Sequence, residues 1–95
     1  MFENLKLTDN AKIAQYEVRD YMQSLGYKCI LEYGVKDRYD GNSGRIDIVC
    51  FKNNETIAIE VDNKKPRKKS IYKLENFNAN KKYVICRNGK NIEVE

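Results

Sequence analysis

The chain has 95 residues, a formal net charge of +4 and a hydrophobic fraction of 41%, which predicts one globular domain over residues 1–95. No apolar run approaches the roughly 20 residues that span a bilayer and no signal-peptide core follows Met1, so we expect a soluble cytoplasmic protein with no membrane partner. Because the chain has no histidine and its 3 cysteines lack Cys-x-x-Cys spacing, zinc fingers, thiol redox motifs and histidine-activated nucleophiles are disfavoured, and buried reduced thiols are expected.

The first predicted element is an amphipathic helix. Apolar residues recur at helical spacing as far as Leu25, Thr8 or Asp9 is suitable as the N-cap, and Gly26 is suitable as the closing residue.

A strand is predicted next, over residues 27–35, because Cys29, Leu31 and Tyr33 alternate with the residues between them and should share one face. A polar loop over residues 36–44 follows this strand.

Two β-branched runs, residues 45–51 and 56–61, then predict a hairpin with a tight turn between them. A second helix is expected to begin at Ser70, or a few residues earlier, and to pack on the sheet through Ile71, Leu74 and Phe77. Short strands over residues 82–86 and 91–94 flank the two-residue turn signal Asn88-Gly89. The order is thus α-β-β-β-α-β-β, which predicts an α/β domain with a central mixed sheet flanked by helices.

Two acidic residues stand alone inside the apolar runs of the predicted hairpin. If the turn is centred on Asn53 and Asn54, Asp47 faces Glu60 with Cβ atoms about 4.5–5.5 Å apart, an arrangement that repels unless a cation lies between the carboxylates. Asp62 should point to the same face. Oxygen ligands without sulfur or imidazole favour Mg²⁺ or Mn²⁺. The alternative is a solvent-open strand face on which the charges only maintain solubility.

Two further carboxylates are candidates for the same site. Glu17 falls within the apolar face of the first helix, where it should be partly covered and is as suitable for a metal ligand as for an ordinary helix-edge carboxylate. Glu32, on the first strand, is a weaker candidate of the same kind.

The segments Gly44-Arg45-Ile46-Asp47 and Ile59-Glu60-Val61-Asp62, joined by a short hairpin within this order of elements, resemble the PD-(D/E)XK nuclease superfamily. Small Holliday-junction-resolvase-like and very-short-patch-repair-like nucleases are the most similar members. The resemblance covers nearly the whole chain and implies a restriction-endonuclease-like core in which Asp47, Glu60 and Glu17 bind catalytic Mg²⁺. The family's E-x-K lysine is replaced by Asp62, so Lys64 and Lys73 are candidates for the missing lysine, and Asp62 itself for a metal ligand or a water-orienting base.

The second half of the chain is basic. Residues 1–62 carry 8 basic and 11 acidic side chains, whereas residues 63–95 carry 10 and 3. Such a split predicts an acidic site beside a phosphate-binding surface, with Tyr72 available to stack on a base. An ordinary solvated loop is the alternative. The predicted nucleic-acid contacts are Lys64, Lys65, Arg67, Lys68, Lys69 and Lys73.

The function predicted from these features is a Mg²⁺-dependent endodeoxyribonuclease acting on DNA, with branched or otherwise structured DNA as a candidate substrate and RNA as an open alternative. For paired cuts, a nuclease of this size is expected to act as a homodimer. A catalytically inactive DNA-binding module and a protein-interaction domain are the competing interpretations. A calcium loop at residues 37–44 is disfavoured, because its spacing misses the alternating pattern of ligands.

Overall fold

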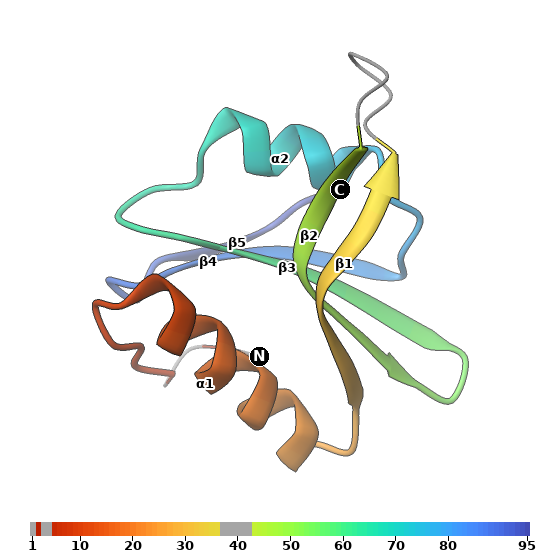
Figure 1. Cartoon of the computed structure of the whole chain (residues 1–95), viewed down its shortest axis with the longest axis horizontal. Helices are drawn as coiled ribbons and strands as arrows, with labels where there is room; N and C mark the ends of the chain where they lie inside the picture. Colours follow the sequence, from red (N-terminus) through yellow and green to blue (C-terminus); the bar gives the residue numbers. More distant parts are fainter. Residues whose placement is uncertain (1, 3–4, 37–42) are drawn as a thin grey trace.

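A computed structural model of the protein describes residue 2 and residues 5–36 and 43–95. It contains one five-stranded sheet with a helix on each side (Figure 1). The elements in chain order are α1 (Ala11–Ser24), β1 (Lys28–Lys36), β2 (Ser43–Lys52), β3 (Glu55–Asp62), α2 (Lys68–Glu75), β4 (Lys81–Cys86) and β5 (Asn91–Glu93).

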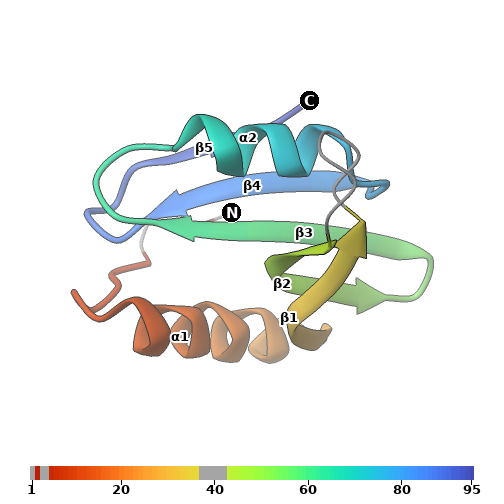
Figure 2. The same ribbon diagram turned by 45° about the horizontal axis from the view of Figure 1, so that its top comes forward.

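The strands lie side by side in the order β1-β2-β3-β4-β5. β3 and β4 are parallel and are connected by α2, while the other neighbouring strands are antiparallel. Figure 2 shows α1 on one face of the sheet and α2 on the other. The prediction of a small α/β domain with a mixed sheet flanked by helices is confirmed.

The N-cap of α1 differs from the prediction, whereas the end of α1 and the start of α2 agree with it. α1 is capped by Asn10, whose side chain accepts hydrogen bonds from the N–H groups of Lys12 and Ile13, so the choice of Thr8 or Asp9 was wrong. Closure at Gly26 is confirmed, since its φ of +94° is a conformation that favours glycine. α2 begins at Lys68, which the prediction of a start at Ser70 or a few residues earlier includes. Ser70 lies within its first turn, where its hydroxyl donates to the Asp62 carboxylate of the preceding strand.

The predicted hairpin between β2 and β3 is confirmed in its register. The strands are joined through Asn53 and Asn54, Asn53 has a φ of +53°, and Ile48 pairs with Ile59 as expected. The second hairpin is wider than predicted. Its ladder bonds include one of 2.6 Å from the N–H of Cys86 to the carbonyl of Lys90, which encloses a three-residue loop instead of a two-residue turn.

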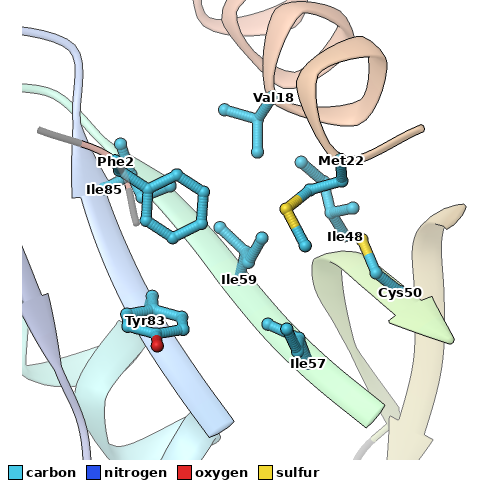
Figure 3. Close-up of a cluster of buried hydrophobic side chains, with 9 residues drawn as sticks. All are labelled: Phe2, Val18, Met22, Ile48, Cys50, Ile57, Ile59, Tyr83 and Ile85. Atoms are coloured by element: carbon cyan, nitrogen blue, oxygen red, sulfur yellow. The ribbon is translucent and has the colours of Figure 1, made fainter. Parts of the chain in front are cut away.

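Each helix covers its own apolar cluster. Val18 and Met22 of α1 pack on one face of the sheet with the side chains drawn in Figure 3, and Leu74 of α2 packs on the other face with residues such as Val49 and Ala58. Full burial of an isoleucine or leucine side chain stabilises a fold by about 1.5–3 kcal/mol, so both clusters are needed to hold the helices in place. Ile71 and Phe77 pack against the α2 cluster, as predicted.

β1 and β2 bend together at one point. Glu32 has a φ of +52°, and the residues on either side of it face opposite clusters, with Leu31 on the α1 side and Tyr33 on the α2 side. The prediction that Cys29, Leu31 and Tyr33 share a face is therefore wrong. The position opposite Glu32 in the register is Asp47, so the bend lies at the predicted acidic site.

Other predictions concern cysteines and membrane contact. Cys29, Cys50 and Cys86 are free thiols; the first is half-buried and the other two are buried. Neither helix in the described part of the chain has the length and apolarity that crossing a membrane requires. The disfavoured calcium loop falls on residues 37–42 for the most part and so lies outside the described residues.

Candidate functional site

Asp47 and Glu60 lie side by side where β2 and β3 separate. The backbone N–H of Asp47 donates a hydrogen bond of 2.7 Å to Glu60 Oε2, and the N–H of Val61 donates one of 2.8 Å to Asp47 Oδ2. The regular pairing of the two strands ends at Ile48 and Ile59. Each carboxyl group therefore accepts a backbone N–H that the interrupted ladder leaves unpaired, and the two acids predicted to be neighbours are joined through these bonds.

Helix α2 supplies a positive charge to this pair. Lys73 Nζ lies 2.9 Å from Glu60 Oε1 and donates a hydrogen bond of 2.7 Å to the backbone carbonyl of Arg45. The Glu60 side chain is 1% exposed and that of Lys73 is 23% exposed, so the contact is a charge-assisted hydrogen bond in a largely buried setting. Lys73 is one of the two candidates that we named for the E-x-K lysine, which is missing at position 62.

The electrostatic balance of the site favours an additional positive charge. Burial raises the pKa of Glu60 to about 7, the negative charge of Asp47 acts in the same direction, and Lys73 and the Asp47 N–H oppose both. Burial also raises the pKa of Asp47, against the opposing effects of the Val61 N–H and Lys73. One lysine thus compensates only part of the charge of a buried carboxylate and an adjacent half-buried one, and a proton or a metal ion would supply the remainder.

Asp62 is bonded to the residues at the start of α2. Its side chain has no exposed surface. Oδ2 accepts the backbone N–H of Arg67 at 2.8 Å, and Oδ1 accepts Arg67 Nε and Ser70 Oγ, each at 3.0 Å. These bonds fix the loop after β3 and the first turn of α2 to the end of the strand. Within the described residues, no hydrogen bond joins Asp62 to Asp47 or Glu60.

The two remaining carboxylate candidates have partners on the α1 side of the molecule. Glu17 Oε1 accepts the backbone N–H of Thr8 at 2.9 Å, which ties the N-terminal segment to α1. Glu32 forms an ion pair of 3.3 Å with Lys12 Nζ, and its charge contributes to raising the pKa of Asp47. Of these two acids, the structure therefore connects Glu32 electrostatically with the site, whereas the known contact of Glu17 is structural.

The basic segment surrounds the start of α2. β3 ends at Asp62, so Lys64 does not extend the strand on the face of Glu60. It lies in the following loop, where its carbonyl accepts a hydrogen bond from Asn88 Nδ2. Tyr72 is half-buried. The basic residues whose side chains are exposed are Lys64, Lys65, Arg67, Lys68 and Lys69.

The acidic pair fits a hard divalent cation that retains most of its water. Mg²⁺ commonly uses one or two carboxylates together with water and phosphate oxygens, and each carboxylate oxygen has two lone pairs, so the bonds from the Asp47 N–H and Lys73 leave acceptor capacity on Glu60. Across residues 5–36 and 43–95, no group of three or more His, Cys, Asp or Glu side chains is arranged to hold a metal. Two carboxylates would be the protein ligands of such a cation, with water completing its coordination.

Sequence reasoning missed two features of the site. The Arg45 carbonyl that holds Lys73 carries no signal in the sequence, because every residue has such a group. The bond between Asp62 and Ser70 could have been considered, since an aspartate ending a strand and a serine in the next helix are both common anchors of a helix start.

Comparison with protein-family models, curated proteins and solved structures gave no match. The geometry of the site therefore carries the functional argument.

Proposed function

We propose that the protein is a metal-dependent nuclease that hydrolyses DNA phosphodiester bonds, with Asp47, Glu60 and Lys73 as its active site. The observation that carries this proposal is the 2.9 Å contact between Lys73 Nζ and Glu60 Oε1. In the PD-(D/E)XK superfamily the E-x-K motif provides a lysine beside the acidic pair. In this chain position 62 of that motif holds aspartate, and Lys73 would take the place of the missing lysine.

The arrangement of elements supports the same proposal. The two acids lie on a hairpin of a mixed sheet, and the lysine comes from the helix that follows. This is similar to superfamily members that recover the lysine from the following helix. A polar and partly charged cluster also lies where an apolar residue would pack more favourably, a local inconsistency that is typical of functional sites.

Each residue has a distinct part in the proposed reaction. Asp47 and Glu60 would hold Mg²⁺ or Mn²⁺, which when bound lowers the pKa of water and polarises the scissile phosphate. Lys73 is fixed between Glu60 Oε1 and the Arg45 carbonyl, so its ammonium group is positioned to stabilise negative charge that develops on the phosphoryl oxygens. The exposed basic segment would bind phosphates that flank the cleavage site.

A catalytically inactive DNA-binding module is the second candidate. One observation favours it: both carboxylate oxygens of Glu60 already accept a hydrogen bond, from Lys73 and from the Asp47 N–H. The pair could therefore serve only to join β2 and β3 at the bend. In this case DNA would still bind to the basic segment, with affinity that falls as salt rises.

Cleavage assays separate the two candidates. Labelled duplex, single-stranded, flapped and four-way-junction DNA would be incubated with Mg²⁺, Mn²⁺ or EDTA, using wild-type protein, Asp47→Asn and Lys73→Gln. Asp47→Asn retains an oxygen for the Val61 N–H, so it tests the charge with little change in the local bonding. Lys90→Gln is a matched control because it removes an exposed lysine far along the chain from the acidic pair.

The nuclease proposal predicts metal-dependent cutting that Lys90→Gln retains and that Asp47→Asn and Lys73→Gln lose by at least about a hundredfold, since one charge-stabilising group contributes roughly that much. Binding without cutting under every metal condition would favour the inactive module. Equal cutting by Asp47→Asn and wild type would assign the activity to a contaminant or to another site. Light scattering on the protein and its DNA complex would test the expected homodimer.

A further inference from the structure

A pocket of about 200 Å³ lies at one end of the sheet, and neither Glu60 nor Lys73 is among the residues that line it. It opens beside the last residues of β3 and the residue that follows β4, which are the carboxyl ends of the two parallel strands. Ligands of open α/β sheets bind preferentially outside the carboxyl ends of parallel strands. The residues that line the pocket are Ala11, Val61, Asp62, Asn63, Arg67 and Arg87.

Two arginines give this pocket its chemical character. Arg67 Nε lies 3.0 Å from Asp62 Oδ1, and Arg87 Nη1 donates a hydrogen bond of 2.7 Å to the backbone carbonyl of Asp9. Each guanidinium carries five N–H donors, so each is anchored by part of its donors while the others stay available to a ligand. Anchoring matters because a fixed arginine loses less conformational entropy when it binds.

The charge of the pocket is positive. Asp62 is its one acidic lining residue, and the ion pair with Arg67 compensates that charge, which leaves the charge of Arg87. Asp9 lies 3.9 Å from Arg87 Nη1 but its side chain is 99% exposed, so water screens that pair strongly. Ala11 is the first residue of α1, whose first turn has no acidic residue, and the positive end of that helix adds to the same field.

The size of the pocket indicates what it can hold. Its volume corresponds to about six or seven water molecules at roughly 30 Å³ each, which is below the roughly 300 Å³ of the smallest common small-molecule pockets. A single tetrahedral oxyanion fits, whereas a whole nucleotide would extend into solvent. Arginine forks match phosphate oxygens in geometry as well as charge. We infer that this pocket binds a phosphate group, with Arg67 and Arg87 as its main ligands.

The source of the phosphate follows from the proposed function, on which this step rests. The pocket begins at Val61 and Asp62, one and two residues beyond Glu60, which is about 3–7 Å along a strand. A DNA strand with one phosphate at the acidic pair could therefore place its terminal phosphate in the pocket. Free phosphate is the other source of the same chemistry.

The test is a binding titration in EDTA, so that it does not depend on metal or on cleavage. Backbone amide resonances of ¹⁵N-labelled protein would be followed during titration with inorganic phosphate, with a short 5′-phosphorylated DNA oligonucleotide, and with the same oligonucleotide lacking the phosphate. Arg87→Gln is the main variant. Arg67→Gln is the second, because each arginine also bonds to its own part of the fold, and Lys90→Gln removes one charge from the same hairpin outside the pocket.

We expect saturable shifts of Ala11, Asn63 and Arg87, and at least tenfold tighter binding of the phosphorylated oligonucleotide. Both arginine variants should abolish that preference while their spectra remain those of a folded protein, and Lys90→Gln should keep it. Shifts with inorganic phosphate but no preference between oligonucleotides would support the phosphate site with free phosphate as its source. Absence of saturable shifts with every phosphate ligand, or shifts that both arginine variants retain, would overturn the inference. Failure of the nuclease proposal would appear separately, as lack of metal-dependent cleavage.

Discussion

Replacing Glu60 by glutamine tests the electrostatic description of the site most directly. In the folded protein the pKa of Glu60 is raised from 4.5 to about 7, mainly by burial and then by Asp47. Each pKa unit corresponds to about 1.4 kcal/mol, so keeping this carboxylate ionised in the fold costs roughly 3 kcal/mol. Between pH 4.5 and about 7 the folded state retains a proton that the unfolded state has released, so the free energy of unfolding falls as the pH rises through this range.

The Glu60→Gln variant lacks this pH dependence of the free energy of unfolding, because glutamine does not titrate. Its single oxygen can accept from either Lys73 or the Asp47 N–H, so the variant loses about 1 kcal/mol of hydrogen bonding at every pH. Near pH 4, where wild-type Glu60 is protonated, Glu60→Gln should be less stable than wild type by about this amount. Near pH 8 it should be more stable, by about 2 kcal/mol, because the larger cost of the buried charge is absent.

Urea unfolding in EDTA at a series of pH values measures both effects. The control is Glu93→Gln, which removes an exposed carboxylate from β5 and should change stability little at any pH. If Glu60→Gln is destabilised equally at pH 4 and pH 8, the ionised carboxylate is well accommodated in the fold, and the argument that the site lacks positive charge is refuted.

Three further outcomes follow from the same geometry. Mg²⁺ at a hundred times its Kd should raise the free energy of unfolding of wild type at pH 8 by about 2.7 kcal/mol. The Asp47→Asn variant should not show this increase. Equal stabilisation of both proteins would place the metal elsewhere. Lys73→Met removes the cation from a mostly buried ion pair, so unfolding at pH 8 should become easier by about 3 kcal/mol, with a smaller change at pH 4 where Glu60 is neutral. Asp62→Asn should cost about 1–3 kcal/mol through its bonds to Arg67 and Ser70 yet leave the Mg²⁺-induced stabilisation intact; loss of that stabilisation would make Asp62 a metal ligand.

Periodicity along the chain was sufficient to predict most of the fold. Apolar spacing predicted both helices and all the strands, and the turn at Asn53 and Asn54 fixed the register that brings Asp47 to Glu60. These features are local, since they depend on residues a few positions apart. What local patterns could not show is the bend at Glu32, where a non-glycine residue with positive φ reverses the faces of the strand, because tertiary packing of two clusters overrides the alternation.

The acidic pair Asp47 and Glu60 could be predicted from sequence, but the contacts that Lys73 and Asp62 make could not. Lys73 and Asp62 are both candidate site residues on sequence grounds. Which of them contacts the acidic pair depends on how α2 crosses the sheet. The crossover brings Lys73 Nζ to Glu60, and the start of the same helix occupies both oxygens of Asp62. Contacts across a crossover join residues that no short-range pattern relates, so a structure is needed to assign them.

A purely structural role for the pair would not require charged side chains. Joining β2 to β3 at the bend requires two acceptors for the N–H groups of Asp47 and Val61, and the side-chain oxygens of asparagine and glutamine would serve as well. Neutral amides would do so without the roughly 3 kcal/mol that the raised pKa of Glu60 implies at neutral pH. A buried and a half-buried acid with one lysine are therefore a costly way to join two strands, which supports the proposal that the pair binds a divalent cation. Comparing Mg²⁺-dependent stability with cleavage in Asp47→Asn tests this distinction, because a structural joint predicts that neither responds to metal.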